Sequence, residues 1–343
     1  MNQNALKGLL IILVIFDHNE YAHKMFPSFL AGFSFHVVGF LALPFLRPAD
    51  KCEKKTLEKM FFSYYYPFFW IVCGMALVNI VIGRHVTAIH FLRVLLALYS
   101  GNSNILESTT QMSMLWFLPS FLSLMLMRSI TVSLSAYAKT FFLLVIFILH
   151  LLVGRLAATL CDYLPLGLLP AIYAIPVVLV IIFLYHKVLE KIHRLLALLA
   201  SSVVFLIVKY WQIRMGLSQE LGFAEVADYR DISALVINDL EAITGTLVVF
   251  QLARFSWGGF IEKCGQYSLQ VYLFHAFVAL AAYNLIEKGL PDTAISVRLV
   301  VSMSVTIVVS SLIAIAIMKN TRTKRLLFPR SWRELTHQNN IQN

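Results

Sequence analysis

The residues best suited to chemistry lie in the first apolar stretch, which carries Lys7 near its start and His18 near its end. They are eleven residues apart. A helix therefore places both on one side, with roughly 16 Å of rise between them. An ionisable group at membrane depth is costly and marks a functional site by default. A neutral imidazole there can take a proton from a hydroxyl, as a general base does. The alternative is a structural histidine that hydrogen-bonds to a neighbouring helix.

Other ionisable residues accompany this pair. Asp17 points roughly 100° away from His18 on a helix, so it need not orient the imidazole directly. Lys7 could hold an anionic group that enters from the cytoplasm, or it could be an interfacial lysine that reaches for water. The next apolar stretch contains Phe35-His36 at a depth similar to that of His18. The two histidines either share a polar cavity or are unrelated interfacial residues.

Two later apolar stretches carry polar stripes. Asn238, Glu241 and Gly245 recur at i, i+3 and i+7, so they can line one helix face. Acidic residues within membranes pair with a cation or mark a pathway. The residues of this stripe could contribute to binding of a substrate that accepts a transferred group.

The second stripe consists of Ser268, Tyr272 and His275, at i, i+4 and i+7. Such a stripe faces a cavity or other helices rather than lipid. Hydrogen bonding between helices and catalysis both remain open for these three residues.

The composition dictates the elements that must position these residues. The 343-residue chain is 59% hydrophobic and only 13% charged, with a mean hydropathy of +0.77. Soluble domains are about 25% charged, so this composition indicates a polytopic membrane protein. Its apolar stretches do not alternate as barrel strands do, and backbone groups in lipid need partners within their own segment. We therefore expect an all-α fold. The four cysteines show no disulfide or metal-binding pattern.

The apolar stretches predict about ten transmembrane helices. They are expected near residues 5–22, 30–46, 60–82, 113–130, 140–159, 166–186, 193–212, 232–251, 267–287 and 295–318. The stretch 88–99 is too short to span. Of the Lys and Arg residues, 19 fall in the loops on one side and 6 in those on the other, which predicts that both termini are cytoplasmic. The chain is thus predicted to form one membrane domain, 1–318, and a basic cytoplasmic tail, 319–343. The basic charge of the tail is more typical of a segment that contacts anionic lipid headgroups than of one that binds nucleic acid.

Further residues lie at the predicted membrane interfaces. The loop with Lys51, Lys54, Lys55 and Lys59 could receive phosphates, or it could simply reflect the inside preference of positive charge. The run Tyr64-Tyr65-Tyr66 and Trp116 fit the aromatic belts that mark bilayer surfaces.

Four elements in order resemble the membrane-bound acyltransferase family 3, whose relatives include fucose 4-O-acetylase-like proteins. Lys7 and His18 resemble its basic-X10-His signature, Phe35-His36 its FH element, and Leu115–Pro119 its WFL element. The run from Gly265 to His275 resembles its G-x-x-S-L-x-x-Y-L-F-H element. The chain departs from the family at Asp17, where glycine is common, and at Leu43-Pro44, where Ser-Gly is common.

The resemblance implies acyl transfer, usually of acetyl, from cytoplasmic acyl-coenzyme A to a hydroxyl of a surface or exported glycan, within the bacterial inner (plasma) membrane. His18 would act as a general base or through an acyl-histidine relay, with Asp17 beside it. No metal is implied. Anionic coenzyme phosphates suit the basic residues on the inner side. The expected coenzyme contacts are Lys7, Lys59 and Tyr66. The expected cavity-lining or substrate-binding residues are His36, Trp116, Glu241, Ser268, Tyr272 and His275.

Two other functions fit a polytopic membrane protein. A transporter or flippase of a lipid-linked sugar would line its path with ionisable residues such as Lys209, Asp239, Glu241 and Arg298, but the sequence shows no repeated halves. A glycan polymerase would need a large outer loop, whereas the longest ones expected are 83–112 and 213–231. Acceptor specificity would lie in those two loops, and their residues indicate no particular sugar.

Overall fold

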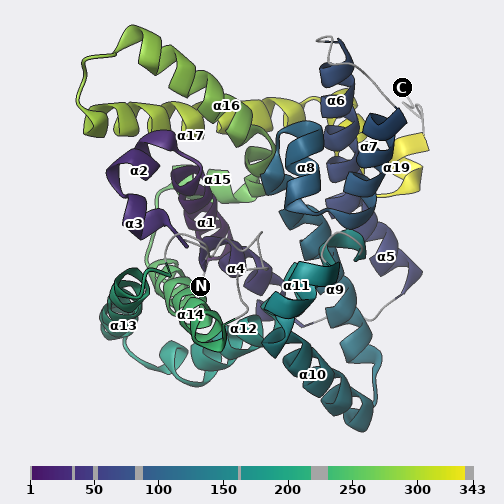
Figure 1. Cartoon of the computed structure of the whole chain (residues 1–343), viewed down its shortest axis with the longest axis vertical. Coiled ribbons are helices and arrows are strands. Elements are labelled where there is room, and N and C mark those ends of the chain that lie inside the picture. The colour runs from purple at the N-terminus through teal and green to yellow at the C-terminus, as the bar shows by residue number, and fades with distance from the viewer. Residues whose placement is uncertain are drawn as a thin grey trace. The chain divides into compact units, whose positions relative to one another are not determined.

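The computed structural model describes residues 2–32, 35–48, 53–81, 88–160, 164–217 and 231–336. Of these residues, 86% are helical and none forms a strand. Figure 1 shows this all-helical architecture. The predicted fold class, an all-α membrane protein, agrees with it, because only helices satisfy their own backbone groups within lipid segment by segment.

Within the described ranges, eight helical stretches are long and apolar enough to cross a membrane. They match eight of the ten expected spans and are Pro27–Leu46, Lys54–Asn79, Ser113–Ser133, Pro165–Lys191, Arg194–Arg214, Ile232–Leu252, Ser268–Gly289 and Ile295–Lys319. The other two expected spans are shorter: α1 (Gln3–Asp17) has 15 residues and α10 (Ala136–Leu151) has 16. Helix α7 (Ala88–Ser100), with 13 residues, is short, as the sequence predicts for 88–99. The number of crossings and the side of each terminus remain predictions.

The chain divides into two compact units. The first contains residues 1–43, 177–223 and 232–319, and the second contains residues 44–176, 224–231 and 320–343. Helix α12 (Leu168–Lys187) contributes to both. The first unit holds α1, α2 (Glu20–Met25), α3 (Pro27–Leu30), α4 (Phe35–Ala42), η5 (Leu189–Lys191), α13 (Arg194–Arg214), α14 (Ile232–Leu252), α15 (Gly259–Gln266), α16 (Ser268–Gly289) and α17 (Ile295–Lys319).

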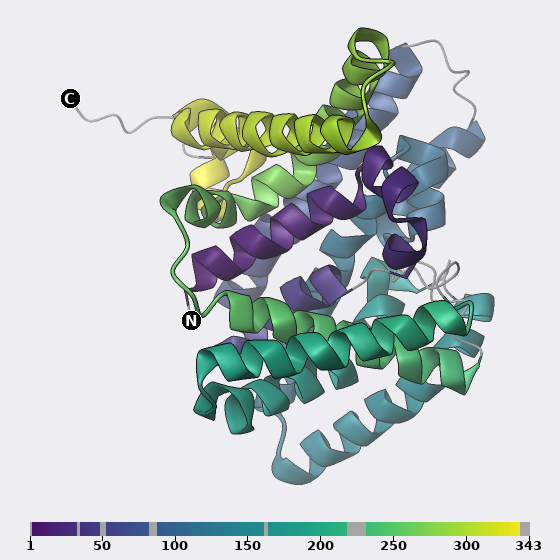
Figure 2. The same ribbon diagram turned by 90° about the vertical axis from the view of Figure 1, so that its left-hand side faces the viewer.

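Helix α1 is the centre of the first unit. It contacts α4, α14, α15, α16 and α17, while α16 pairs with α17 and α13 pairs with α14. In Figure 2, α1 (purple) lies between the α16–α17 pair and the α13–α14 pair. A residue on α1 can therefore meet side chains from several other helices of this unit.

Two glycines let α1 and α15 touch through their backbones. A Cβ at Gly265 would lie 1.7 Å from the carbonyl oxygen of Asn4, and one at Gly8 would lie 2.1 Å from that of Ile261. Small residues permit this close approach of membrane helices. The Asn2 amide also donates to the Glu262 carboxylate at 2.7 Å, at the beginning of α1.

Helix α1 ends earlier than its apolar run predicts. The run was expected to span 5–22, but α1 stops at Asp17 and α2 begins at Glu20. The Asn19 side chain accepts hydrogen bonds from the backbone N–H groups of Tyr21 and Ala22, so it caps the new helix. His18 is thereby placed at a helix boundary.

The second unit holds η1 (Leu43–Leu46), α5 (Lys54–Met60), the π-helical η2 (Phe61–Tyr65), α6 (Tyr66–Val81), α7, α8 (Ser103–Thr110), η3 (Ser113–Trp116), α9 (Phe117–Ser133), α10, α11 (Val153–Leu160), η4 (Pro165–Gly167), α18 (Thr321–Leu327) and α19 (Trp332–Thr336). The tail helices pack onto this unit. The Tyr66 hydroxyl donates to the Leu326 carbonyl at 3.0 Å, and Trp332 stacks on Phe61. Residues 321–327 and 332–336 of the predicted basic tail thus form two short helices.

Candidate functional site

The packing of α1 against α16 brings His18 and His275 together. Nδ1 of His18 lies 3.4 Å from Nε2 of His275, and the two rings meet edge to face with centroids 5.1 Å apart. His275 is fully buried, whereas His18 is exposed. The sequence identifies both residues, and the structure joins them into one pair.

Backbone contacts fix the tautomer of each ring. Nδ1 of His18 lies 2.9 Å from the Val14 carbonyl oxygen, and Nδ1 of His275 lies 2.6 Å from that of Tyr272. A carbonyl oxygen only accepts, so each Nδ1 carries the hydrogen and each Nε2 keeps its lone pair. Nε2 of His275 can therefore accept from Nδ1–H of His18, and the free base of the pair is Nε2 of His18.

This arrangement suits proton abstraction. In a serine hydrolase, an acceptor on Nδ1–H holds the catalytic imidazole in the productive tautomer and stabilises the imidazolium that forms. The Val14 carbonyl and His275 take that place here. The geometry supports a general base whose partner is a neutral histidine.

Asp17 is directed to α4 rather than to His18. Its carboxylate lies 3.6 Å from Nε2 of His36, which is 1% exposed. The neighbouring positions Asp17 and His18 thus face different partners, as their angular separation on a helix predicts. Asp17 thus places His36 beside the end of α1 that carries His18, so His18 and His36 belong to one polar region.

A second buried pair joins α13 and α14. Nζ of Lys209 lies 3.8 Å from the Glu241 carboxylate, with side chains 2% and 0% exposed. Lys209 also donates to the Gln212 side chain at 2.8 Å and to the Ala31 carbonyl at 3.2 Å. It therefore ties the turn after α3 to the α13–α14 pair.

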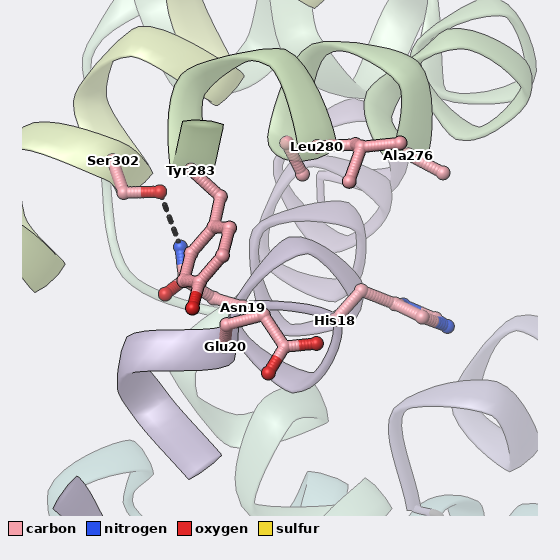
Figure 3. Close-up of a pocket in the computed structure, with 8 residues that line it drawn as sticks. His18, Asn19, Glu20, Ala276, Leu280, Tyr283 and Ser302 are labelled. Atoms are coloured by element: carbon pink, nitrogen blue, oxygen red, sulfur yellow. Dashed lines mark hydrogen bonds between the residues drawn. The ribbon is translucent and has the colours of Figure 1, made fainter. Parts of the chain in front are cut away.

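A pocket of about 150 Å³ lies beside His18. Its walls come from the end of α1, the start of α2, α16 and α17 (Figure 3). Figure 3 shows Tyr283 reaching from α16 toward the Asn19–Glu20 turn, while the ring of His18 extends away from Tyr283. The lining residues are His18, Asn19, Glu20, Ala276, Ala279, Leu280, Tyr283 and Ser302.

Charged groups cluster beside this pocket. Lys24 donates to the Tyr283 hydroxyl at 3.0 Å and lies 3.6 Å from the Glu287 carboxylate, which is 3.3 Å from Arg298. The Tyr283 hydroxyl and the Glu287 carboxylate raise the pKa of the exposed Lys24 ammonium. Lys24 and Arg298 are both engaged with Glu287, which neutralises part of their charge.

The other predicted site residues lie elsewhere in the two units. Lys7 is half-buried on α1, Ser268 begins α16, and Tyr272 is 7% exposed, with its ring centroid 5.7 Å from that of His275. In α14, Asn238, Glu241 and Gly245 are buried. The second unit holds Lys59, exposed on α5, together with Tyr66 and Trp116, both buried. Lys51, also in the predicted basic loop, lies outside the described residues, as do residues 218–230 of the predicted outer loop 213–231.

Several contacts could not be inferred from the sequence. The Asn19 amide donates to the Ser302 hydroxyl at 2.9 Å across 283 positions, and nothing in the sequence pairs these residues. The signal that was available is Asn19-Glu20 after an apolar run, a typical start of a new helix. The residues expected to line a transport path pair separately, Lys209 with Glu241 and Arg298 with Glu287.

The fold and the site together define a multi-pass, all-helical membrane protein with a histidine pair between α1 and α16. Within the described part of the chain, no group of three or more His, Cys, Asp or Glu side chains is arranged to hold a metal ion. No protein-family model, curated protein or solved structure matches the chain significantly.

Proposed function

We propose that this protein is a membrane O-acyltransferase of the family 3 type. It would move an acyl group, in the first instance acetyl, from cytoplasmic acyl-coenzyme A to a hydroxyl of a surface or exported glycan, in a bacterial inner (plasma) membrane. The observation that carries the proposal is the His18–His275 pair, 3.4 Å apart, which leaves Nε2 of His18 as a free base.

The reaction needs one base that also returns its proton. Nε2 of His18 takes the proton of the acceptor hydroxyl as its oxygen attacks the thioester carbonyl carbon. The new C–O bond forms, the C–S bond breaks, and the thiolate of the coenzyme receives the proton from His18. The products are an ester and a free thiol, and His18 is neutral again. A covalent acyl-histidine would use the same lone pair as the nucleophile.

The position of Lys7 supports a donor that arrives from the opposite end of α1. Lys7 precedes His18 by about three turns, roughly 16 Å along the helix. A cation there suits a coenzyme phosphate, and the slender arm of the coenzyme would extend toward His18.

Replacing the base tests the proposal directly. His18→Ala should lower acyl transfer by about a hundredfold or more, because proton abstraction would fall to water. The measurement is transfer of radiolabelled acetyl from acetyl-coenzyme A to glycan, by purified protein and by membranes. His193→Ala, at an exposed histidine before α13, is the matched control and should retain activity.

Folding must be measured beside activity. The His18→Ala protein should purify with the wild-type size-exclusion profile and thermal midpoint. Full acetyl transfer by this variant would remove His18 from the mechanism. A wild-type protein that moved a lipid-linked sugar across vesicles, without forming labelled product, would be a transporter instead.

A further inference from the structure

We propose that the pocket beside His18 is the acceptor site, and that it takes a single neutral hexopyranose ring, with Glu20 excluding acidic sugars. The chemistry at His18 rests on the proposed function, whereas binding in the pocket can be tested without it.

The pocket lies at the end of α1 opposite Lys7. Its walls include His18 and the turn that follows it, whereas Lys7 lies eleven residues earlier. An anionic donor held at Lys7 and an acceptor held in the pocket would therefore approach His18 from opposite ends of the helix. A transferase with two substrates on opposite sides needs this separation.

The size and the walls of the pocket suit one sugar ring. Its volume is about 150 Å³. An engineered protein cavity of about that volume holds benzene, a single six-membered ring. Ala276, Ala279, Leu280 and Tyr283 follow the i, i+3, i+4, i+7 spacing of one helix face, so α16 presents a continuous wall. The alanines leave room, and the C–H face of a sugar can pack on such an apolar surface.

The polar groups around the pocket are held in place. The Asn19 amide donates to the Ser302 hydroxyl, and its oxygen caps α2, so the turn that carries His18 and Glu20 is attached to α17. Lys24 donates to the Tyr283 hydroxyl. A site whose groups are already positioned loses less entropy when a ligand binds.

Glu20 is the exception among these groups. Its carboxylate faces the region between Tyr283 and His18 in Figure 3, and within the described ranges it has no hydrogen-bond or ion-pair partner. A carboxylate accepts strong hydrogen bonds from hydroxyl groups. It also repels a second carboxylate in the same pocket. The nearby cations do not offset this repulsion fully, because Glu287 already pairs with both Lys24 and Arg298.

The decisive experiment compares two probes that differ in charge. Acetyl transfer to methyl glucoside and to methyl glucuronoside is measured with the wild type and with Glu20→Gln, which keeps the shape and removes the charge. The wild type should favour the glucoside by about tenfold or more in kcat/KM, as removal of one like-charge contact allows. Glu20→Gln should accept both probes within about threefold of each other, by the same reasoning.

A second variant tests the space itself. Ala279→Leu should fill the pocket and raise KM for methyl glucoside by about tenfold or more, as steric exclusion from a small pocket does. Ala281→Leu, at an exposed position of the same helix outside the pocket lining, is the matched control.

The outcomes separate the two proposals. Binding of the two glycosides is also measured by saturation-transfer NMR without any acyl donor. One outcome is that the wild type binds the glucoside in preference to the glucuronoside, that Glu20→Gln loses this preference, and that no acyl transfer occurs. This outcome would support the pocket as a sugar-binding site and would exclude the proposed function. If acyl transfer occurs, but Glu20→Gln does not change its selectivity and Ala279→Leu does not change the KM for the acceptor, the pocket proposal alone would be overturned.

Two further results would also overturn it. In the first, Ala279→Leu changes the preference among acetyl-, butyryl- and hexanoyl-coenzyme A but leaves the KM for the glucoside unchanged. The pocket would then be a site for the acyl group. Failure of every methyl hexopyranoside both to bind and to react would exclude a single sugar ring as its ligand.

Discussion

His18 owes its chemical character to the groups that hold its other nitrogen. The Val14 carbonyl lies 2.9 Å from Nδ1, so this nitrogen carries the hydrogen and cannot act as the base. His275 provides a second acceptor for the same N–H. When Nε2 takes up a proton, the ring becomes a cation whose Nδ1–H faces two acceptors. A neutral histidine in this place stabilises the imidazolium without adding a buried negative charge.

The role of His275 can be separated from simple packing by two substitutions. His275→Leu removes the acceptor and should lower kcat about 10- to 100-fold with little change in the KM of either substrate, since the partner of a general base affects the reaction step. His275→Gln offers an oxygen near the position of Nε2 and should recover most of that loss. Steady-state kinetics of acetyl transfer measures both variants.

A purely structural histidine would behave differently. Both variants would then lose activity in proportion to their loss of folded protein, and the remaining folded fraction would turn over at the wild-type rate. Equal kcat values for His275→Leu and His275→Gln would therefore count against a positioning role.

For individual residues, the sequence identifies the participants of the histidine pair but not which residue each one contacts. His18 and His275 stood out because ionisable side chains are rare in apolar stretches. Their pairing depends on how α1 lies against α16, which no local pattern encodes. The tautomers depend on the Val14 and Tyr272 carbonyls, and any helical residue has such carbonyls nearby.

Among the elements, the α13–α14 pair contains a buried ion pair. Lys209 and Glu241 lie 3.8 Å apart, and Lys209 also holds the Ala31 carbonyl beyond α3. The chain leads from that turn into α4, which places His36 beside Asp17. This ion pair therefore lies between two spanning helices and holds the turn that follows α3.

Breaking this pair should destabilise the fold, and removing it entirely should not. Lys209→Met leaves Glu241 buried without its cation and should cost about 3–5 kcal/mol, as loss of one partner of a buried pair does. Lys209→Met with Glu241→Leu should recover most of that stability. The thermal midpoint and the fraction of monodisperse protein in detergent report both effects.

A lysine outside the pair provides the control. Lys187→Met, at an exposed position of α12, should leave the midpoint within a degree or two of wild type, as surface substitutions usually do. If Lys209→Met were as stable as Lys187→Met, the pair would contribute nothing measurable to the packing of α13 on α14.

Element boundaries were predicted less well than the elements themselves. The apolar run from 5 to 22 indicated one helix, but the hydrogen bonds of Asn19 to the N–H groups of Tyr21 and Ala22 begin a new one at Glu20. Hydropathy does not register a cap, because Asn19 is one polar residue within a long apolar window. The close contact of α1 with α15 likewise depends on Gly8 and Gly265, whose role is visible only when the two backbones meet.

For the whole molecule, composition alone is enough to predict the class. A chain that is 59% hydrophobic must place much of its surface in lipid, and lipid restricts it to helices in the absence of alternating strands. The number of crossings is a finer property. Since α1 and α10 have only 15 and 16 residues, their hydropathy does not decide whether each one crosses. The charge bias between loops therefore carries the topology prediction.

Contacts within the first unit allow the predicted topology to be tested. Lys24 lies 3.6 Å from Glu287, so the α2 region and the end of α16 must lie on one side of the membrane whatever the total number of spans. Helix α17, with 25 residues, is about 37 Å long and exceeds a hydrocarbon core of about 30 Å. A crossing by this helix places its two ends, Ile295 and Lys319, on opposite sides, and Lys288 lies in the chain shortly before Ile295.

Single cysteines report these sides. In a background without the four native cysteines, Lys24→Cys and Lys288→Cys should react with a membrane-impermeant maleimide added to intact cells, whereas Lys319→Cys should react only after permeabilisation. Equal labelling of all three variants in permeabilised cells is the control. Labelling of Lys319→Cys from outside would reverse the orientation, place the pocket beside His18 on the cytoplasmic side, and leave an exported glycan unable to reach it.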